Sequence, residues 1–165
     1  YAITAIIGKR EVMEAAQSSF ISSTFWTERI GPTAALKTLE EMERLESWKI
    51  ITEKGLEIKK RWGKLADHHG LKINQWGIPS LAGFSLNYTN ALAYKSFISQ
   101  EMLGNGILAS NAIYSSVAHT DALTNRYFDV LEMVFQKISN CEKGVLNIDQ
   151  LLNGSICHDG FKRLN

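Results

Sequence analysis

The 165-residue chain has few cysteines and no long apolar run. Cys141 and Cys157 are its only cysteines and form no CxxC pair, which excludes a disulfide scaffold and favours a reduced, cytoplasmic setting. The apolar stretch over residues 1–7 ends at Gly8 and the charged residues 9–11, so it is far too short to cross a membrane. It also lacks the basic lead-in of a signal peptide.

The chain has no excess of charge of one sign. It carries 18 basic and 17 acidic residues, a formal net charge of +1, and the two signs are interleaved along the sequence. Without a basic stripe, a nucleic-acid partner is not expected. With 45% apolar and 21% charged residues, the composition is that of an ordinary globular domain, neither disordered nor membranous.

Common catalytic and metal-binding motifs are also missing. There is no P-loop, dinucleotide fingerprint or nucleophile elbow. His68 and His69 end a charged helical segment, where imidazoles suit the helix carboxyl end, and His119 is typical of a hydrogen-bonded joint between a strand and a helix. The adjacent Cys-His-Asp triplet at 157–159 cannot converge as a triad. Because the histidines have no third ligand at suitable spacing, no metal site is predicted.

The hydrophobic pattern predicts an α+β fold. Apolar residues recur at helical spacing in four stretches and alternate, or are β-branched, in several shorter ones. We expect a small, mostly antiparallel sheet covered by helices, with a tail over residues 140–165. We expect one helix after Pro32, a second that ends near Gly70, a third over residues 90–103 and a fourth after a cap at Thr120. The expected strands are 3–7, 71–75, 81–86, 107–109 and 112–117.

The beginning of the chain is unusual for a natural terminus. Residues 1–7 are apolar and rich in β-branched side chains, whereas natural termini tend to be polar and frayed. We therefore expect Tyr1 to lie inside a longer parent protein; a clipped tag or a processed start is the alternative.

A loop rich in hydroxyl groups precedes the first long helix. Ser22, Ser23, Thr24 and Thr27 lie close to a helix N-terminus, where unpaired N–H groups and the helix dipole favour a phosphate. Serine and threonine at such a place are also ordinary helix caps. The residues alone leave both interpretations open.

Four segments together resemble a known enzyme family. The run Ser22-Ser-Thr-Phe-Trp-Thr-Glu-Arg-Ile-Gly-Pro32 and the helix after it resemble the Gly-Thr-x-Ser-Gly-Asn-Pro segment of glutamate-semialdehyde aminomutases and class III aminotransferases. Residues 1–11 resemble the strand that follows the catalytic lysine. Residues 104–109 and 114–120, with Ala118-His-Thr-Asp121, resemble two late segments of that family, although Ser110 or Asn111 replaces a common proline. The matches are in the right order over residues 1–138.

The resemblance implies a fold, a cofactor and a site. The fold is that of the C-terminal small domain of a fold-type I transferase dependent on pyridoxal 5'-phosphate (PLP), in which a lysine forms a Schiff base with the cofactor and then moves the proton. In this family the enzyme is a homodimer acting on a small amino compound. Thr24, with Ser23, matches the residue that binds the cofactor phosphate of the other subunit, and Phe25 and Trp26 match positions near the substrate entrance. The lysine and the aspartate at the pyridine nitrogen belong before Tyr1, so no catalytic residue is assigned in this chain.

The resemblance also implies a division of the chain. Residues 1–45 correspond to a remnant of the large cofactor domain with the interdomain helix, residues 46–139 to the small domain, and residues 140–165 to its tail. Aminotransferase and aminomutase are not distinguished. A stand-alone, non-catalytic α+β interaction domain derived from this fold is the alternative.

Overall fold

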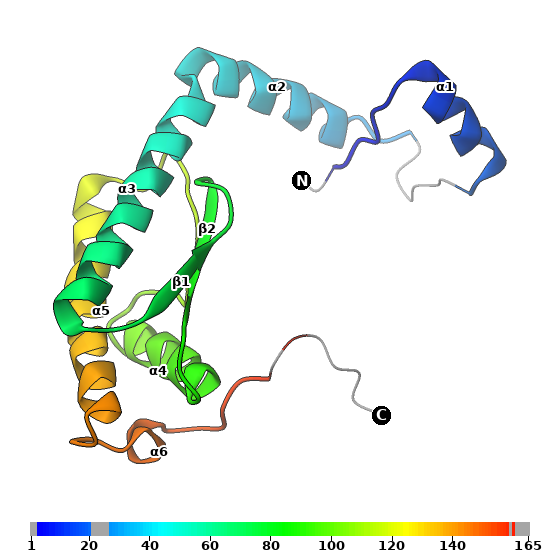
Figure 1. Ribbon diagram of the computed structural model, residues 1–165. Helices are drawn as coiled ribbons and strands as arrows, with labels where there is room; N and C mark the ends of the chain where they lie inside the picture. Colours follow the sequence, from blue (N-terminus) through cyan, green and yellow to red (C-terminus); the bar gives the residue numbers. More distant parts are fainter. Residues whose placement is uncertain (1–2, 21–26, 159, 161–165) are drawn as a thin grey trace. The chain divides into compact units, whose positions relative to one another are not determined.

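A computed structural model describes residues 3–20, 27–158 and 160 of the chain (Figure 1). The chain divides into two compact units, unit 1 with residues Tyr1–Ser47 and unit 2 with residues Trp48–Asn165. None of the helices in the described ranges is both long enough and apolar enough to span a membrane.

Unit 1 is helical in its described part. It contains the short helix α1 (Arg10–Met13), the 3-10 helix η1 (Glu14–Ser18) and the long helix α2 (Ile30–Leu45). The prediction of a strand over residues 3–7 is wrong, since these residues are exposed and pair with no strand. A strand needs a neighbour for its backbone hydrogen bonds, and the described residues of unit 1 supply none.

In its described residues, unit 2 is built largely from four helices. They are α3 (Ser47–His69), α4 (Ala91–Gly104), α5 (Asp121–Glu142) and the short α6 (Ile148–Leu151). The predicted cap at Thr120 is confirmed, because its side chain accepts a hydrogen bond from the Leu123 N–H. Gly106, with φ 73°, follows the end of α4. Its N–H donates to the Leu103 carbonyl and the Ile107 N–H donates to the Met102 carbonyl, and these two bonds close the helix.

The sheet of unit 2 is small and antiparallel, as predicted. Its strands are β1 (Ile73–Trp76), β2 (Leu81–Leu86) and β3 (Ala112–Tyr114), in the order β1-β2-β3. The strand predicted over 107–109 is wrong: the Ile107 N–H is used to close α4, and the Ala109 N–H bonds to the Ile107 carbonyl in a tight turn. The predicted strand over 112–117 is shorter, ending at Tyr114.

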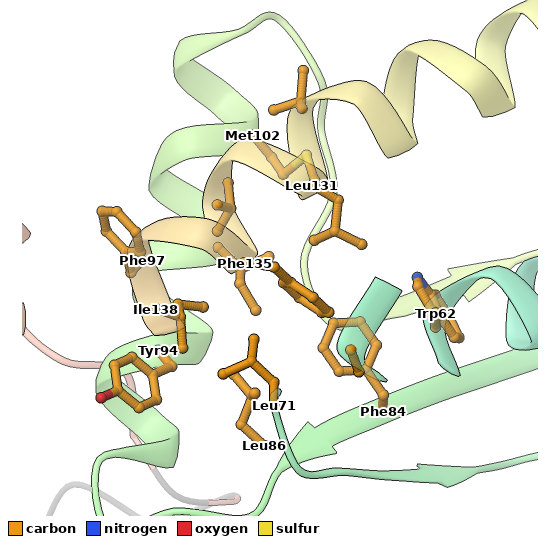
Figure 2. Close-up of a cluster of buried hydrophobic side chains, with 14 of the residues drawn as sticks. Trp62, Leu71, Phe84, Leu86, Tyr94, Phe97, Met102, Leu131, Phe135 and Ile138 are labelled. Atoms are coloured by element: carbon orange, nitrogen blue, oxygen red, sulfur yellow. The ribbon is translucent and has the colours of Figure 1, made fainter. Parts of the chain in front are cut away.

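A single apolar core joins the helices of unit 2 to the sheet (Figure 2). Trp62 of α3 lies 5.0 Å from Phe84 of β2 between ring centroids, and Phe84 lies 5.7 Å from Phe135 of α5. The indole N–H of Trp62 donates to the Tyr127 hydroxyl at 2.9 Å. These contacts fix α3 beside α5, as Figure 1 shows.

The segment that follows α5 packs along α4. Ile148 of α6 is buried, Gln100 donates its amide to the Leu151 carbonyl, and the Asn153 N–H donates back to Gln100 at 2.7 Å. The Cys157 N–H donates to the Ser96 hydroxyl at 2.8 Å. Up to Cys157, this segment is therefore part of the α4 surface of unit 2.

Candidate functional site

The residues predicted to bind a phosphate, Ser23 and Thr24, lie outside the described residues, as do Phe25 and Trp26. What the structure describes is the helix end that follows them. The Glu28 carboxylate accepts a hydrogen bond from the Ile30 N–H at 3.0 Å, and Pro32 has no N–H to offer. The assignment of Ser23 and Thr24 stays a prediction.

A cavity in unit 2 lies where the two late family-like segments meet. Its volume is about 470 Å³, and residues 106–109 and β3 form one side of it. The other sides come from Ile58 of α3 and from the first turns of α5, including Leu123 and Arg126. Sequence reasoning named residues 104–109 and 114–120 separately but did not predict that they share a cavity.

The polar groups at this cavity are largely engaged. His119 accepts the Ser116 N–H at its Nδ1 at 3.1 Å, which confirms its predicted role as a hydrogen-bonded joint. Arg126 donates to the Asn105 carbonyl at 3.0 Å. Burial raises the pKa of Tyr127 well above its usual range, so its hydroxyl stays neutral. The polar side chains of His119, Arg126 and Tyr127 are therefore already engaged in hydrogen bonds within unit 2.

Two of the described lysines, Lys37 and Lys54, are not suited to Schiff-base chemistry. A nucleophilic lysine needs a lowered pKa, from desolvation or a cationic neighbour. Hydrogen bonds from their ammonium groups to carboxylates instead raise the pKa of Lys37, through Glu40 and Glu41, and of Lys54. No lysine is among the residues that line the cavity.

Lys54 of α3 lies between two carboxylates. Its side chain is only 14% exposed, and its ammonium donates to Asp121 at 2.6 Å and to Glu57 at 2.9 Å. The carboxylates that surround it hold the proton on the amine. Lys54 thus forms a partly exposed ion pair that links α3 to the start of α5, and it is protonated.

The chain is similar to known aminotransferases, although no protein-family model matches it. The chain is 33% identical over 96 residues to 3-aminobutyryl-CoA aminotransferase of Cloacimonas acidaminovorans (strain Evry), covering 58% of this chain and 23% of that protein. It is 25% identical over 135 residues to 2'-deamino-2'-hydroxyneamine transaminase of Streptomyces kanamyceticus, covering 77% of this chain and 33% of that protein.

A solved structure shares the fold. The FumI protein of Sphingopyxis sp. MTA144, in its PLP internal aldimine form, matches with a TM-score of 0.70 at 16% identity, over 88% of this chain and 36% of that one. The chain thus spans about a quarter to a third of the length of the curated relatives it matches. The predicted α+β fold and the predicted resemblance are both confirmed: the relatives of this chain are aminotransferases, and its fold is that of part of a PLP-bearing protein.

Proposed function

We propose that the chain is the C-terminal part of a class III, PLP-dependent aminotransferase or aminomutase. The observation that carries the proposal is the similarity to two aminotransferases, over 96 and 135 residues, in a chain whose fold matches a PLP-bearing protein over 88% of its length. When bound, PLP supplies an electron sink for the carbon that carries the substrate amino group. The reaction proposed for the whole protein is transfer or 1,2-migration of an amino group on a small amino compound.

The described residues indicate what this chain would contribute. Carboxylates hold Lys37 and Lys54 as ammonium ions and no lysine lines the cavity, which supports placing the Schiff-base lysine in the parent before Tyr1. Residues 1–45 are proposed as a remnant of the large cofactor domain, residues 46–139 as the small domain and residues 140–165 as its tail. The change of compact unit after Ser47 supports the first boundary. A cytoplasmic homodimer, in which Thr24 reaches the phosphate of the neighbouring site, completes the proposal.

Transamination of a supplied amino donor tests the proposed reaction. The full-length parent should carry PLP and should move the amino group of a donor to a 2-oxo acid, forming one new amino acid for each oxo product. Conversion of one amino compound into its positional isomer, with no requirement for a 2-oxo acid, would instead identify an aminomutase. A full-length protein that neither binds PLP nor performs either reaction would contradict the proposal.

A non-catalytic interaction domain is the second candidate. The observation that favours it is a group of exposed apolar side chains in unit 2 around the cavity segment, with Leu108 95% and Tyr114 73% exposed. The coding sequence before Tyr1 distinguishes the two candidates. An open frame with a lysine and a glycine-rich turn supports the enzyme, and a stop or an unrelated domain supports the interaction domain.

Thr24→Ala tests the proposed phosphate contact in the full-length parent. We expect PLP binding to weaken by about 1.5–3 kcal/mol, the usual value of a hydrogen bond to a charged group. Thr24→Ser keeps the hydroxyl and should largely restore binding. Thr38→Ala is the matched control, because Thr38 lies on α2 and its hydroxyl bonds the Ala34 carbonyl of its own helix. Equal cofactor dissociation constants for Thr24→Ala and Thr38→Ala would remove Thr24 from the site.

The isolated 165-residue chain should form no specific adduct with PLP. Protonated, ion-paired lysines give only weak and unselective adducts, so borohydride trapping and peptide mapping should find no dominant labelled lysine. The full-length parent, treated in the same way, serves as the positive control. One stoichiometric phosphopyridoxyl label on a single lysine of the isolated chain, at micromolar cofactor, would place the active site within these residues.

A further inference from the structure

Three potential metal ligands meet where the end of α3 lies against α5. They are His68 and His69, the last two residues of α3, and Glu132 in the middle of α5. One ligand atom from each residue lies within 4.8 Å of the others. The His69 Nε2 and a Glu132 carboxylate oxygen are 3.7 Å apart.

The buried imidazole of His69 has an unsatisfied nitrogen. The side chain is 5% exposed, and its Nε2 has no hydrogen-bond partner among the described residues. The separation of 3.7 Å from Glu132 is too long for a hydrogen bond. A buried polar atom without a partner costs about 1–3 kcal/mol, so such an atom calls for a physical explanation. A cation between Nε2 and Glu132 would provide one.

The other two ligands are open to solvent. His68 and Glu132 border a groove of about 380 Å³ that also contains Asp129, Arg61 and Lys64. The groove provides a path for an ion from solvent. Arg61 stacks on the Phe128 ring at 4.0 Å and donates to Asn125, so its charge is held along α5 and the ligand atoms stay accessible.

We propose that His68, His69 and Glu132 form a binding site for a divalent transition-metal ion, with Zn²⁺ as the best match. Bond lengths of about 2.0–2.1 Å to nitrogen and oxygen place the ligands of a tetrahedral zinc ion roughly 3.4 Å apart. The His69–Glu132 separation of 3.7 Å is close to that value. The exposed side chains of His68 and Glu132 can rotate to close the remaining distance, and water takes the fourth position.

The ligand set selects among metals. Two imidazoles and one carboxylate suit Zn²⁺, Co²⁺ or Ni²⁺, whereas Ca²⁺ and Mg²⁺ require oxygen ligands. The sequence pattern predicted no metal site because Glu132 lies 63 residues after His69 and only the fold brings them together. The bound ion would link the end of α3 to α5 and stabilise unit 2.

Zinc titration of the 165-residue chain, by calorimetry or by competition with a chromophoric chelator, tests the proposal. We expect one Zn²⁺ per chain with a dissociation constant in the micromolar range or below, a tetrahedral Co²⁺ spectrum, and no binding of Ca²⁺ or Mg²⁺. Glu132→Gln removes the carboxylate at an exposed position and keeps its shape. It should weaken zinc binding at least tenfold without changing the melting temperature of the metal-free chain.

The controls separate this site from other zinc ligands. His68→Asn should also weaken binding at least tenfold, whereas Cys157→Ser combined with His158→Asn should leave the zinc dissociation constant unchanged. Zinc should raise the melting temperature of the unaltered chain but not of Glu132→Gln. Zinc binding that persists undiminished in Glu132→Gln, or that disappears with the Cys157 and His158 substitutions, overturns the proposal.

Discussion

Trp62→Ala is expected to destabilise unit 2 by about 3–5 kcal/mol, the range measured when a buried aromatic side chain is truncated to alanine. Trp62 is fully buried and packs against Phe84, which in turn contacts Phe135, so the indole lies between α3, β2 and α5. Its loss also leaves the buried Tyr127 hydroxyl without its donor at 2.9 Å. A domain with ordinary stability of 5–15 kcal/mol would lose a large part of it.

Urea unfolding followed by circular dichroism measures this effect. Trp62→Phe separates its two parts, because phenylalanine keeps most of the ring packing and removes only the hydrogen bond to Tyr127, and it should cost about 1–2 kcal/mol. Trp48→Ala is the matched control: Trp48 lies on the same helix, α3, and is 46% exposed, so its loss should change stability by no more than about 0.5 kcal/mol. Similar midpoints for Trp62→Ala and Trp48→Ala would contradict the proposed core.

The helices of this chain were predictable because their residues carry a local signal. Along α5, apolar residues recur with the helical period, and Tyr127, Val130, Leu131, Val134 and Ile138 are all buried as the pattern predicts. The caps and ends were also local: a threonine precedes α5, and a glycine of positive φ follows α4. Such features depend on neighbours within one or two turns, which the sequence displays directly.

Strands were predicted less well because a strand exists only with its partner. Residues 3–7 have strong β propensity, yet no described segment of unit 1 pairs with them. β2 is a strand since β1 and β3 bind its two edges. Residues 107–109 are β-prone as well, but the chain uses the Ile107 N–H to close α4. Tertiary context decided all three cases.

The candidate sites show the same limit. The hydroxyl-rich loop and the family-like segments are linear patterns, so the sequence pointed to them. The cavity and the group of His68, His69 and Glu132 both combine residues of distant elements. The contact of α3 with α5 brings the three potential metal ligands together. That contact depends on buried groups such as Trp62 and Tyr127, and no spacing rule connects residues 65 positions apart.

Two glycines on α3 should respond in opposite ways to alanine. Gly55 is buried, and a Cβ there would lie 1.8 Å from the Pro79 carbonyl oxygen and 2.4 Å from its carbon. A Cβ at Gly63 would meet only the end of the Gln75 side chain, at 3.4 Å. Helix propensity favours alanine over glycine by about 1 kcal/mol at either position, so packing decides the sign.

The neighbour of Gly55 cannot easily move. Pro79 lies in the turn between β1 and β2, which is held by the Leu81 N–H to the Ile78 carbonyl at 3.0 Å and by the Lys59 ammonium to the Gly77 carbonyl at 3.0 Å. The Ser115 N–H also bonds to the Ser80 carbonyl, which ties the same turn to the segment after β3. Relief of the clash requires α3 to separate from this turn and from the sheet edge.

We therefore expect Gly55→Ala to destabilise unit 2 by about 1–3 kcal/mol, the usual cost of overpacking, after the gain in helix propensity. Gly63→Ala should be neutral or more stable by up to about 1 kcal/mol, because the Gln75 amide can shift by a few tenths of an ångström. Urea midpoints of the two variants, measured beside the unaltered chain, check the difference. If Gly55→Ala were as stable as Gly63→Ala, α3 would not pack against the β1–β2 turn as described, since the substitutions are chemically identical and differ only in what the new methyl group meets.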